Sequence, residues 1–229
     1  MDGTTLRDAR KARPWTQKQA AEALGVTQAY LSMLERGRRE LPEELVRKAL
    51  KTLAVRPTAL PLPSAEEFRA GNRNHDFSAA LGALGYPKFA YLRKKKRVNP
   101  ALLLFDALNQ ADLDSRVAEG LPWLAHTYVD MNWEWLGRNA RVHDRQNRLG
   151  FAVSLAREVA ERENDRDRAE KLRQCLDSLE RARLAREDTF CHDGMTEAEK
   201  TWLRQHRSPT AKHWNLLTDL RGELLAYEP

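Results

Sequence analysis

Five side chains close together near the start of the chain have the types needed to contact the edges of DNA bases. They are Gln28, Ala29, Tyr30, Ser32 and Met33. A glutamine amide pairs bidentately with adenine in the major groove, while hydroxyl and apolar side chains contact other base edges. This chemistry requires a helix that presents these residues at or near an exposed N-terminal face.

A first short helix is predicted immediately before these residues. Thr16 is a good N-cap residue, and Gln19, three residues later, completes a capping box. Trp15, directly before the cap, can pack against Ala20 as a hydrophobic staple. Gly25 suits the left-handed residue that ends a helix, so the first helix is expected to end there.

A second short helix would carry the five side chains. Thr27 can cap its N-terminus, and Leu31 and Leu34 would then face inward. The segment 16–37 therefore predicts two short helices joined by a tight glycine turn. A helix presented in this way fits the major groove of DNA. The alternative is that the segment is a plain helical hairpin in an all-α protein.

These residues resemble the Cro/C1-type (XRE-like) helix-turn-helix family over about residues 6–60. The resemblance implies that Gln17 touches phosphate and that Gln28 is the first base-contacting residue. It also implies that Arg10 and Glu35 tie the first helix to the recognition helix. The DNA-binding residues proposed from the pattern and the resemblance together are Gln17, Thr27, Gln28, Ala29, Tyr30, Ser32, Met33, Arg36, Arg38 and Arg39.

The chain departs from the family pattern in two places. Arg13-Pro14-Trp15 replaces the usual glycine-containing turn, and Ala20 stands where a larger aliphatic residue is usual. Both differences affect the packing of the first turn and leave the base-contacting face unchanged.

Composition agrees with a nucleic-acid partner. The chain has 229 residues and a formal net charge of +6, which favours a polyanion. However, 31% of the residues are charged with both signs mixed, so a soluble, charge-rich helical protein is the alternative. The sequence contains no apolar run long enough for a membrane span and no signal-peptide pattern. We therefore expect a cytoplasmic protein with no membrane association, in which Cys175 and Cys191 are reduced thiols.

Three parts are predicted along the chain. Residues 1–56 form the DNA-binding head of four to five helices, and residues 57–76 form a linker that begins with three prolines in seven positions. Residues 77–229 form a larger helical domain for dimerisation or partner binding, so the fold class is all-α. Helices of this domain are expected at 77–84, 100–110, 114–128, 133–163, 166–186, 196–206 and 210–225.

Two further clusters in the second domain admit more than one interpretation. The basic run RKKKR at 93–97 could contact DNA phosphates, dock an acidic partner, or simply be a solvated loop. A second cluster could line a polar pocket or form a buried network that fixes helix packing, and we favour the network. Its members are His143, Asp144, Gln146, Asn147 and Arg148.

No catalytic residue, metal site or cofactor is predicted. Cys191-His192-Asp193 are adjacent, so their side chains should diverge, and no second pair of ligands lies at metal-binding spacing. Known phosphate-binding, zinc-protease and hydrolase motifs are absent from the sequence. We therefore expect that the protein is not an enzyme. An enzyme fused to a DNA-targeting head is the weakest of three hypotheses.

The leading hypothesis is a sequence-specific transcription regulator, most simply a dimeric repressor of its own gene that binds double-stranded DNA at an inverted repeat. The alternative is the antitoxin of a toxin–antitoxin pair. In that case residues 77–229 would bind and neutralise a toxin, while the head represses the operon.

Overall fold

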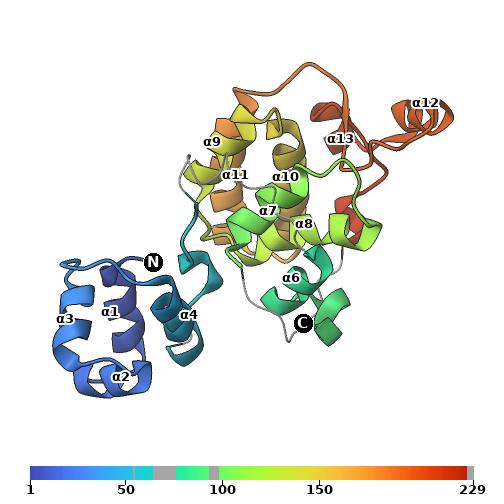
Figure 1. Cartoon of the computed structure of the whole chain (residues 1–229). Helices are drawn as coiled ribbons and strands as arrows, with labels where there is room; N and C mark the ends of the chain where they lie inside the picture. The colour runs from blue at the N-terminus through green and yellow to red at the C-terminus, as the bar shows by residue number, and fades with distance from the viewer. Residues whose placement is uncertain (54, 64–75, 93–97, 226–229) are drawn as a thin grey trace. The chain divides into compact units, whose positions relative to one another are not determined.

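The computed structural model describes residues 1–53, 55–63, 76–92 and 98–225. It divides into two compact units, Met1–Asn72 and Arg73–Pro229. Both are built almost entirely of helices, which confirms the predicted all-α fold (Figure 1). The basic run at 93–97 and most of the expected linker lie outside the described residues.

The first unit packs four α-helices around one small core. They are α1 (Gly3–Ala12), α2 (Gln17–Leu24), α3 (Gln28–Glu35) and α4 (Glu43–Thr52), followed by the 3-10 turn η1 (Pro57–Ala59). Leu6, Leu24, Leu31, Leu34 and Ala49 are almost completely buried where the helices meet. The inward-facing leucines expected for α3 are thus in place, and Glu35 at the end of the helix is buried with them, while Gln28–Met33 apart from Leu31 keep solvent-accessible surface.

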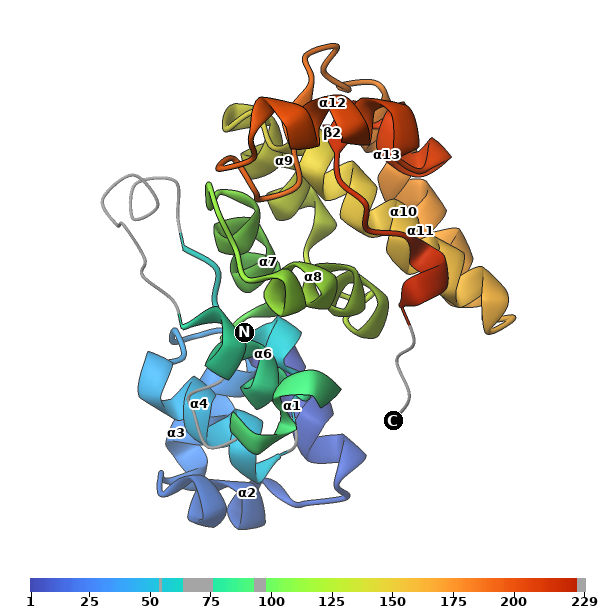
Figure 2. The same cartoon turned by 90° about the vertical axis from the view of Figure 1, so that its right-hand side faces the viewer.

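The second unit is assembled around α10 (Gln146–Arg162). Most residues of this helix are buried. In the direction of the chain, the elements before it are α6 (Phe77–Leu84), η2 (Pro87–Leu92), α7 (Pro100–Leu108), α8 (Ser115–Thr127) and α9 (Trp133–Val142). Those after it are α11 (Arg166–Glu180), β1 (Asp188–Thr189), α12 (Glu197–His206), α13 (Pro209–His213), β2 (Leu216–Leu217) and η3 (Gly222–Leu224). Helix α10 packs against α7, α8, α9, α11 and α13, and it runs beside α11 in Figure 2.

The single helix predicted over 133–163 is wrong, because the chain breaks between α9 and α10. Asp144 adopts a positive φ of 56°, a left-handed conformation that aspartate tolerates better than most residues. The break lets α9 and α10 pack against each other as separate helices. Gly150 lies within α10, and its role is described below.

The helix predicted over 210–225 is also wrong. Helix α13 ends at His213, and Asn215 turns the chain with a φ of 52°. The Asn215 amide donates to the carbonyl oxygen of Leu184 at 2.8 Å. The turn brings β2 alongside β1 as a short parallel pair, Asp188 opposite Leu216 and Thr189 opposite Leu217. Helix α11 likewise ends at Glu180, six residues before the predicted end at 186.

Gly150 makes room for a tryptophan that closes the core. Trp214 is buried, and its indole N–H donates to the Ser154 hydroxyl at 2.8 Å. A Cβ atom at Gly150 would lie 2.4 Å from the Trp214 ring carbons, closer than any real contact. At Gly137, by contrast, the nearest atom to a Cβ would be 3.9 Å away. Two helical glycines in one unit therefore differ sharply in the space around them.

We predict that Gly150→Ala destabilises the protein by about 1–3 kcal/mol, since the tryptophan must shift. Gly137→Ala is the matched control and should stabilise it by about 0.5–1 kcal/mol, because alanine favours the helix. Urea unfolding followed by near-UV circular dichroism measures both. An unchanged midpoint for Gly150→Ala would contradict the packing of Trp214 on α10.

We also expect a fragment that begins at Phe77 to fold without the head, because the second unit has its own core. Its near-UV circular dichroism and a cooperative thermal transition measure this. A fragment without fixed tertiary structure would show that residues 1–76 and 77–229 depend on one shared core.

Candidate DNA-binding interface

The two helices α2 and α3 form the hairpin that the sequence predicts. The Thr16 hydroxyl accepts from the Gln19 N–H, and the Gln19 side chain accepts in return from the Thr16 N–H at 2.8 Å, which completes the capping box. Gly25 ends α2 with a φ of 72°, in the left-handed region. Thr27 then caps α3 by accepting from the Tyr30 N–H at 3.2 Å.

The N-terminal turn of α3 faces solvent. Gln28 and Ala29 are exposed, while Tyr30, Ser32 and Met33 are half-buried. Leu31 and Leu34 on the opposite face have no exposed surface. The five proposed base-contacting residues are therefore accessible to different degrees, and Gln28 offers the freest amide. Thr27 is exposed as well, but its hydroxyl is engaged in the cap.

A largely buried ion pair fixes α3 to α1. Arg10 Nε donates to Glu35 Oε1 at 2.6 Å, and Arg10 Nη2 donates to Glu35 Oε2 at 2.9 Å. Arg10 Nη1 also donates to the Trp15 carbonyl oxygen at 2.8 Å. The bidentate geometry restrains the rotation of both helices, because two parallel hydrogen bonds define a plane. Arg10 and Glu35 thus form the pair that the family resemblance implied.

Gln17 is part of the same network, which the sequence did not indicate. Its side-chain amide donates to Glu35 Oε2 at 2.9 Å, so Glu35 holds both α1 and the first turn of α2. One of the two amide N–H donors of Gln17 is therefore already used in the free protein. The phosphate contact predicted for Gln17 remains a prediction.

The environment of Glu35 favours its ionised form. Burial of the carboxyl opposes ionisation, but hydrogen bonds from Arg10 and Gln17 and the positive charge of Arg10 outweigh it. The pKa of Glu35 is held below its usual value as a result. The tie between α1, α2 and α3 is thus fully charged at neutral pH.

Three cations follow the recognition helix. Arg36, Arg38 and Arg39 are all exposed, and Gly37 adopts a φ of 68° that turns the chain away from α3. The Arg38 N–H donates to the Met33 carbonyl oxygen at 2.9 Å, which anchors the turn. These three side chains lie just beyond the end of α3 and are exposed, and the phosphate contacts predicted for them remain predictions.

The two departures from the family pattern are accommodated locally. Trp15 lies partly buried against the head core, and its carbonyl oxygen is held by Arg10. The Arg13 guanidinium lies 5.7 Å from the centre of the Trp15 ring, in cation–π range. Ala20 has no exposed surface, so the smaller residue is closely surrounded.

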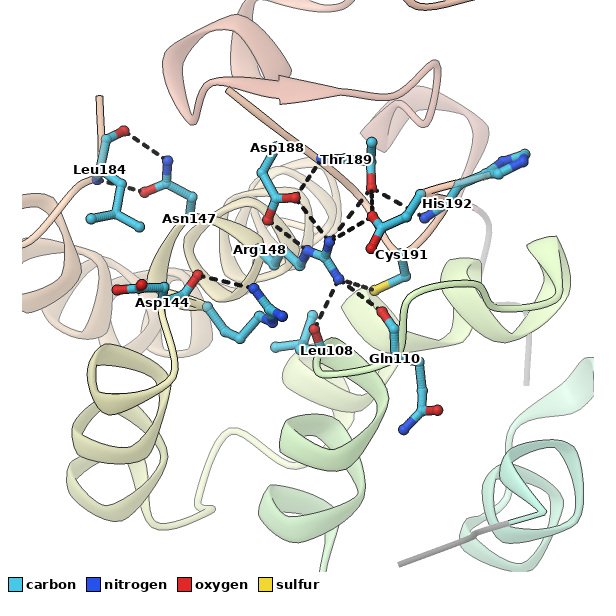
Figure 3. A network of polar contacts seen from close by, with 12 residues as sticks. Leu108, Gln110, Asp144, Asn147, Arg148, Leu184, Asp188, Thr189, Cys191 and His192 are labelled. Atoms are coloured by element: carbon cyan, nitrogen blue, oxygen red, sulfur yellow. Dashed lines mark hydrogen bonds and ion pairs between the residues drawn. The ribbon is translucent and has the colours of Figure 1, made fainter. Parts of the chain in front are cut away.

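The polar cluster of the second unit is a buried network centred on Arg148, as we favoured (Figure 3). Its guanidinium donates to both carboxylate oxygens of Asp188 at 2.8 and 2.9 Å and to Asp193 at 3.0 Å. It also donates to the carbonyl oxygens of Leu108 at 3.2 Å and Gln110 at 2.8 Å. Only 1% of the Arg148 side chain is exposed. The network joins α7, α10 and β1.

Two neighbours of Arg148 are buried and hold the segment after α11, whereas two others lie outside this part of the core. Asn147 exchanges two hydrogen bonds of 2.9 Å with the backbone of Leu184, and Gln146 donates to the Ala182 carbonyl oxygen at 3.1 Å. His143 and Asp144 are exposed instead. Inclusion of these two residues in one cluster with Arg148 was wrong, because the helix break turns Asp144 toward solvent and sets the exposed His143 ring edge-on against Phe105, with ring centres 5.3 Å apart.

Cys191, His192 and Asp193 diverge as expected from adjacent residues. The Cys191 thiol is buried beside Arg148, and burial raises its pKa to about 12, so the thiol is neutral. Asp193 binds Arg148, while His192 is exposed. Within the described residues, no three histidine, cysteine or acidic side chains are grouped to hold a metal. No helix in the same part of the chain has the length and apolar character to cross a membrane.

We predict that Glu35→Gln destabilises the head by about 1–3 kcal/mol at neutral pH, because Arg10 loses its charged partner. The stabilisation from ionised Glu35 is present above the unfolded pKa of about 4.3, and it is lost as the pH falls through the lower folded pKa. In the wild type, the protection of α1 and α3 amides against hydrogen exchange should therefore decline as the pH falls. In Glu35→Gln, this protection should not depend on pH in the same range. Hydrogen exchange followed by NMR measures it, with exposed Glu22→Gln as the control. Equal exchange in Glu35→Gln and wild type would contradict the prediction.

Comparison with known proteins agrees with this geometry over the first unit. Residues 6–60, about a quarter of the chain, match the family model described as Helix-turn-helix. Searches of curated proteins and of solved structures found no match. The second unit has no assigned family. Residues 6–60 therefore form a helix-turn-helix domain of the XRE family, and the chain carries the DNA-binding domain of a transcription regulator.

Proposed function

We propose that this protein is a sequence-specific repressor that binds an inverted repeat upstream of its own gene as a dimer. The observation that carries the proposal is the exposed N-terminal turn of α3, held in a fixed orientation by the Arg10–Glu35–Gln17 network. Double-stranded DNA as the partner agrees with the positive net charge of +6 and implies a cytoplasmic location.

Base contact begins at Gln28. Its amide is exposed at the start of α3, where a helix that enters the major groove places its base-contacting residues. A bidentate pair between this amide and adenine contributes about 1–3 kcal/mol of discrimination against other bases. Ala29, Ser32 and Met33 lie on the same side of the helix and contact neighbouring base edges.

Orientation on the duplex comes from the phosphate backbone. Arg36, Arg38 and Arg39 lie beyond the C-terminal end of α3 and are exposed. Contacts of this kind carry affinity and position the protein, but they carry no sequence information. Gln17 joins them if the second N–H of its side-chain amide donates to a phosphate oxygen while the first stays on Glu35.

Dimerisation follows from the size of the head. One recognition helix contacts too few base pairs to identify a site, and two heads about 34 Å apart along the DNA double the contacts. We assign dimerisation to residues 77–229, the part of the chain that the head does not use. The antitoxin hypothesis assigns the same residues to a toxin, and no contact within the described residues favours it, so it stays a prediction.

We predict that Gln28→Ala weakens operator binding by about 1–3 kcal/mol and relaxes specificity at one base pair. Arg38→Ala should weaken binding to specific and random DNA alike and make the dependence on salt less steep. Fluorescence anisotropy at several salt concentrations measures both effects. The matched controls are Gln205→Ala and Arg186→Ala, exposed residues of the second unit. Unchanged operator affinity in Gln28→Ala would show that α3 docks in another register.

The primary test is footprinting of the purified protein on DNA immediately upstream of its gene, at near-physiological salt. A protected inverted repeat supports the dimeric autorepressor. Diffuse and salt-sensitive protection would overturn it and leave the head as a nonspecific tether. Co-purification of a second polypeptide with the full chain would favour the antitoxin hypothesis instead.

A further inference from the structure

A groove of about 440 Å³ lies between α9 and α11 in the second unit, outside every site described so far. The two helices are neighbours in Figure 1, and they are in contact. The volume falls within the range of small-molecule sites, about 300–1,000 Å³. Its lining consists of Val129, Trp133, Glu134, Gly137, Arg141, Lys171, Gln174, Cys175 and Ser178.

The helical spacing of the lining residues explains the shape of the groove. Lys171, Cys175 and Ser178 are separated by four and three residues, so they form one stripe of α11. Gly137 and Arg141 are four residues apart on α9. Gly137 leaves the wall of α9 without a side chain, and a Cβ atom there would meet nothing closer than 3.9 Å. The absence of a side chain at this position keeps the groove open.

The lining of the groove is more apolar than polar, and its buried cysteine and its tryptophan N–H are not available to react with a ligand. The indole N–H of Trp133 donates to the Val129 carbonyl oxygen at 2.8 Å, so the ring offers only its aromatic surface. Cys175 is buried, and burial raises the pKa of its thiol to about 12, which keeps it neutral. The Ser178 hydroxyl donates to the Cys175 carbonyl oxygen at 2.9 Å. A ligand would therefore gain burial and aromatic contact here, and no covalent chemistry.

The rim carries two unused positive charges. Neither Arg141 nor Lys171 forms a side-chain hydrogen bond or ion pair within the described residues. The nearby cations are paired, Arg138 with Glu134 at 2.8 Å and Arg173 with Glu170 at 2.7 Å. Glu134, the acidic group of the lining, pairs with Arg138 at the exposed edge of the groove, and Arg141 and Lys171 leave the local charge positive. Two cations on opposite helices remain open above an apolar surface.

We propose that this groove binds a small planar aromatic anion. Its ring lies along Trp133 and the open face at Gly137, and its carboxylate meets Arg141 and Lys171. The combination is specific, because a ring without charge leaves both cations unpaired, and a carboxylate without a ring buries little surface. The site belongs to the second unit alone, so it does not depend on DNA binding by the head.

Isothermal titration calorimetry of the full chain with three probes tests the proposal. The probes are 2-naphthoate, which has ring and charge, 2-naphthamide, which lacks the charge, and acetate, which lacks the ring. We expect saturable binding of 2-naphthoate, and binding at least about tenfold weaker for the other two. Absence of saturable 2-naphthoate binding, or equal binding of 2-naphthamide, would overturn the proposal.

Variants then locate the site. Combined Arg141→Ala and Lys171→Ala should weaken 2-naphthoate binding about tenfold and leave 2-naphthamide binding unchanged. Gly137→Leu should abolish binding of both ring compounds, because its side chain fills the groove. Arg166→Ala, an exposed cation on α11 outside the groove, is the control and should bind as wild type. If Gly137→Leu fails to fold, the double variant decides alone, and wild-type affinity in it overturns the proposal.

Discussion

The buried guanidinium of Arg148 is the interaction on which the second unit depends. A charged group out of contact with water is costly unless every donor finds an acceptor. Here two carboxylates and two backbone carbonyl oxygens meet it, from residues about 40 positions away on either side along the chain. Since α7, α10 and β1 each supply part of the arrangement, none of them can move without leaving a charge unsatisfied.

The head follows the same principle on a smaller scale. Arg10 and Glu35 are 25 residues apart and bring α1 against α3, while Gln17 adds α2 to the same carboxylate. Most of this unit was predictable, because the capping box at Thr16, the glycine turn at Gly25 and the inward leucines are local patterns. The pair itself came from the family resemblance. The bond from Gln17 had no local signal, since it spans 18 residues and depends on how the helices meet.

The second unit was less predictable for a related physical reason. The ends of α6 and the presence of α7, α8, α11 and α12 follow from helical spacing and caps. The breaks at Asp144 and Asn215 do not, because both residues adopt left-handed conformations that packing imposes. The pairing of β1 with β2 and the contact between Gly150 and Trp214 join segments far apart in the sequence. Among these contacts between distant segments, the sequence predicted a buried polar network that includes Arg148, but it did not predict the partners Asp188 and Asp193.

The distance between α10 and the residues that cover it has a consequence for synthesis of the protein. Trp214 reaches Ser154 across 60 positions, and Arg162 donates to backbone carbonyl oxygens of Gly222 and Leu225 across 60 and 63. On the ribosome, the head can fold early, whereas the face of α10 that these later residues cover stays exposed until they emerge, even after α7, α8, α9 and α11 have packed on its other faces. For that interval one apolar face of this helix is exposed while the DNA-binding domain is already folded. The second unit is therefore the part of the nascent chain that most needs chaperone protection.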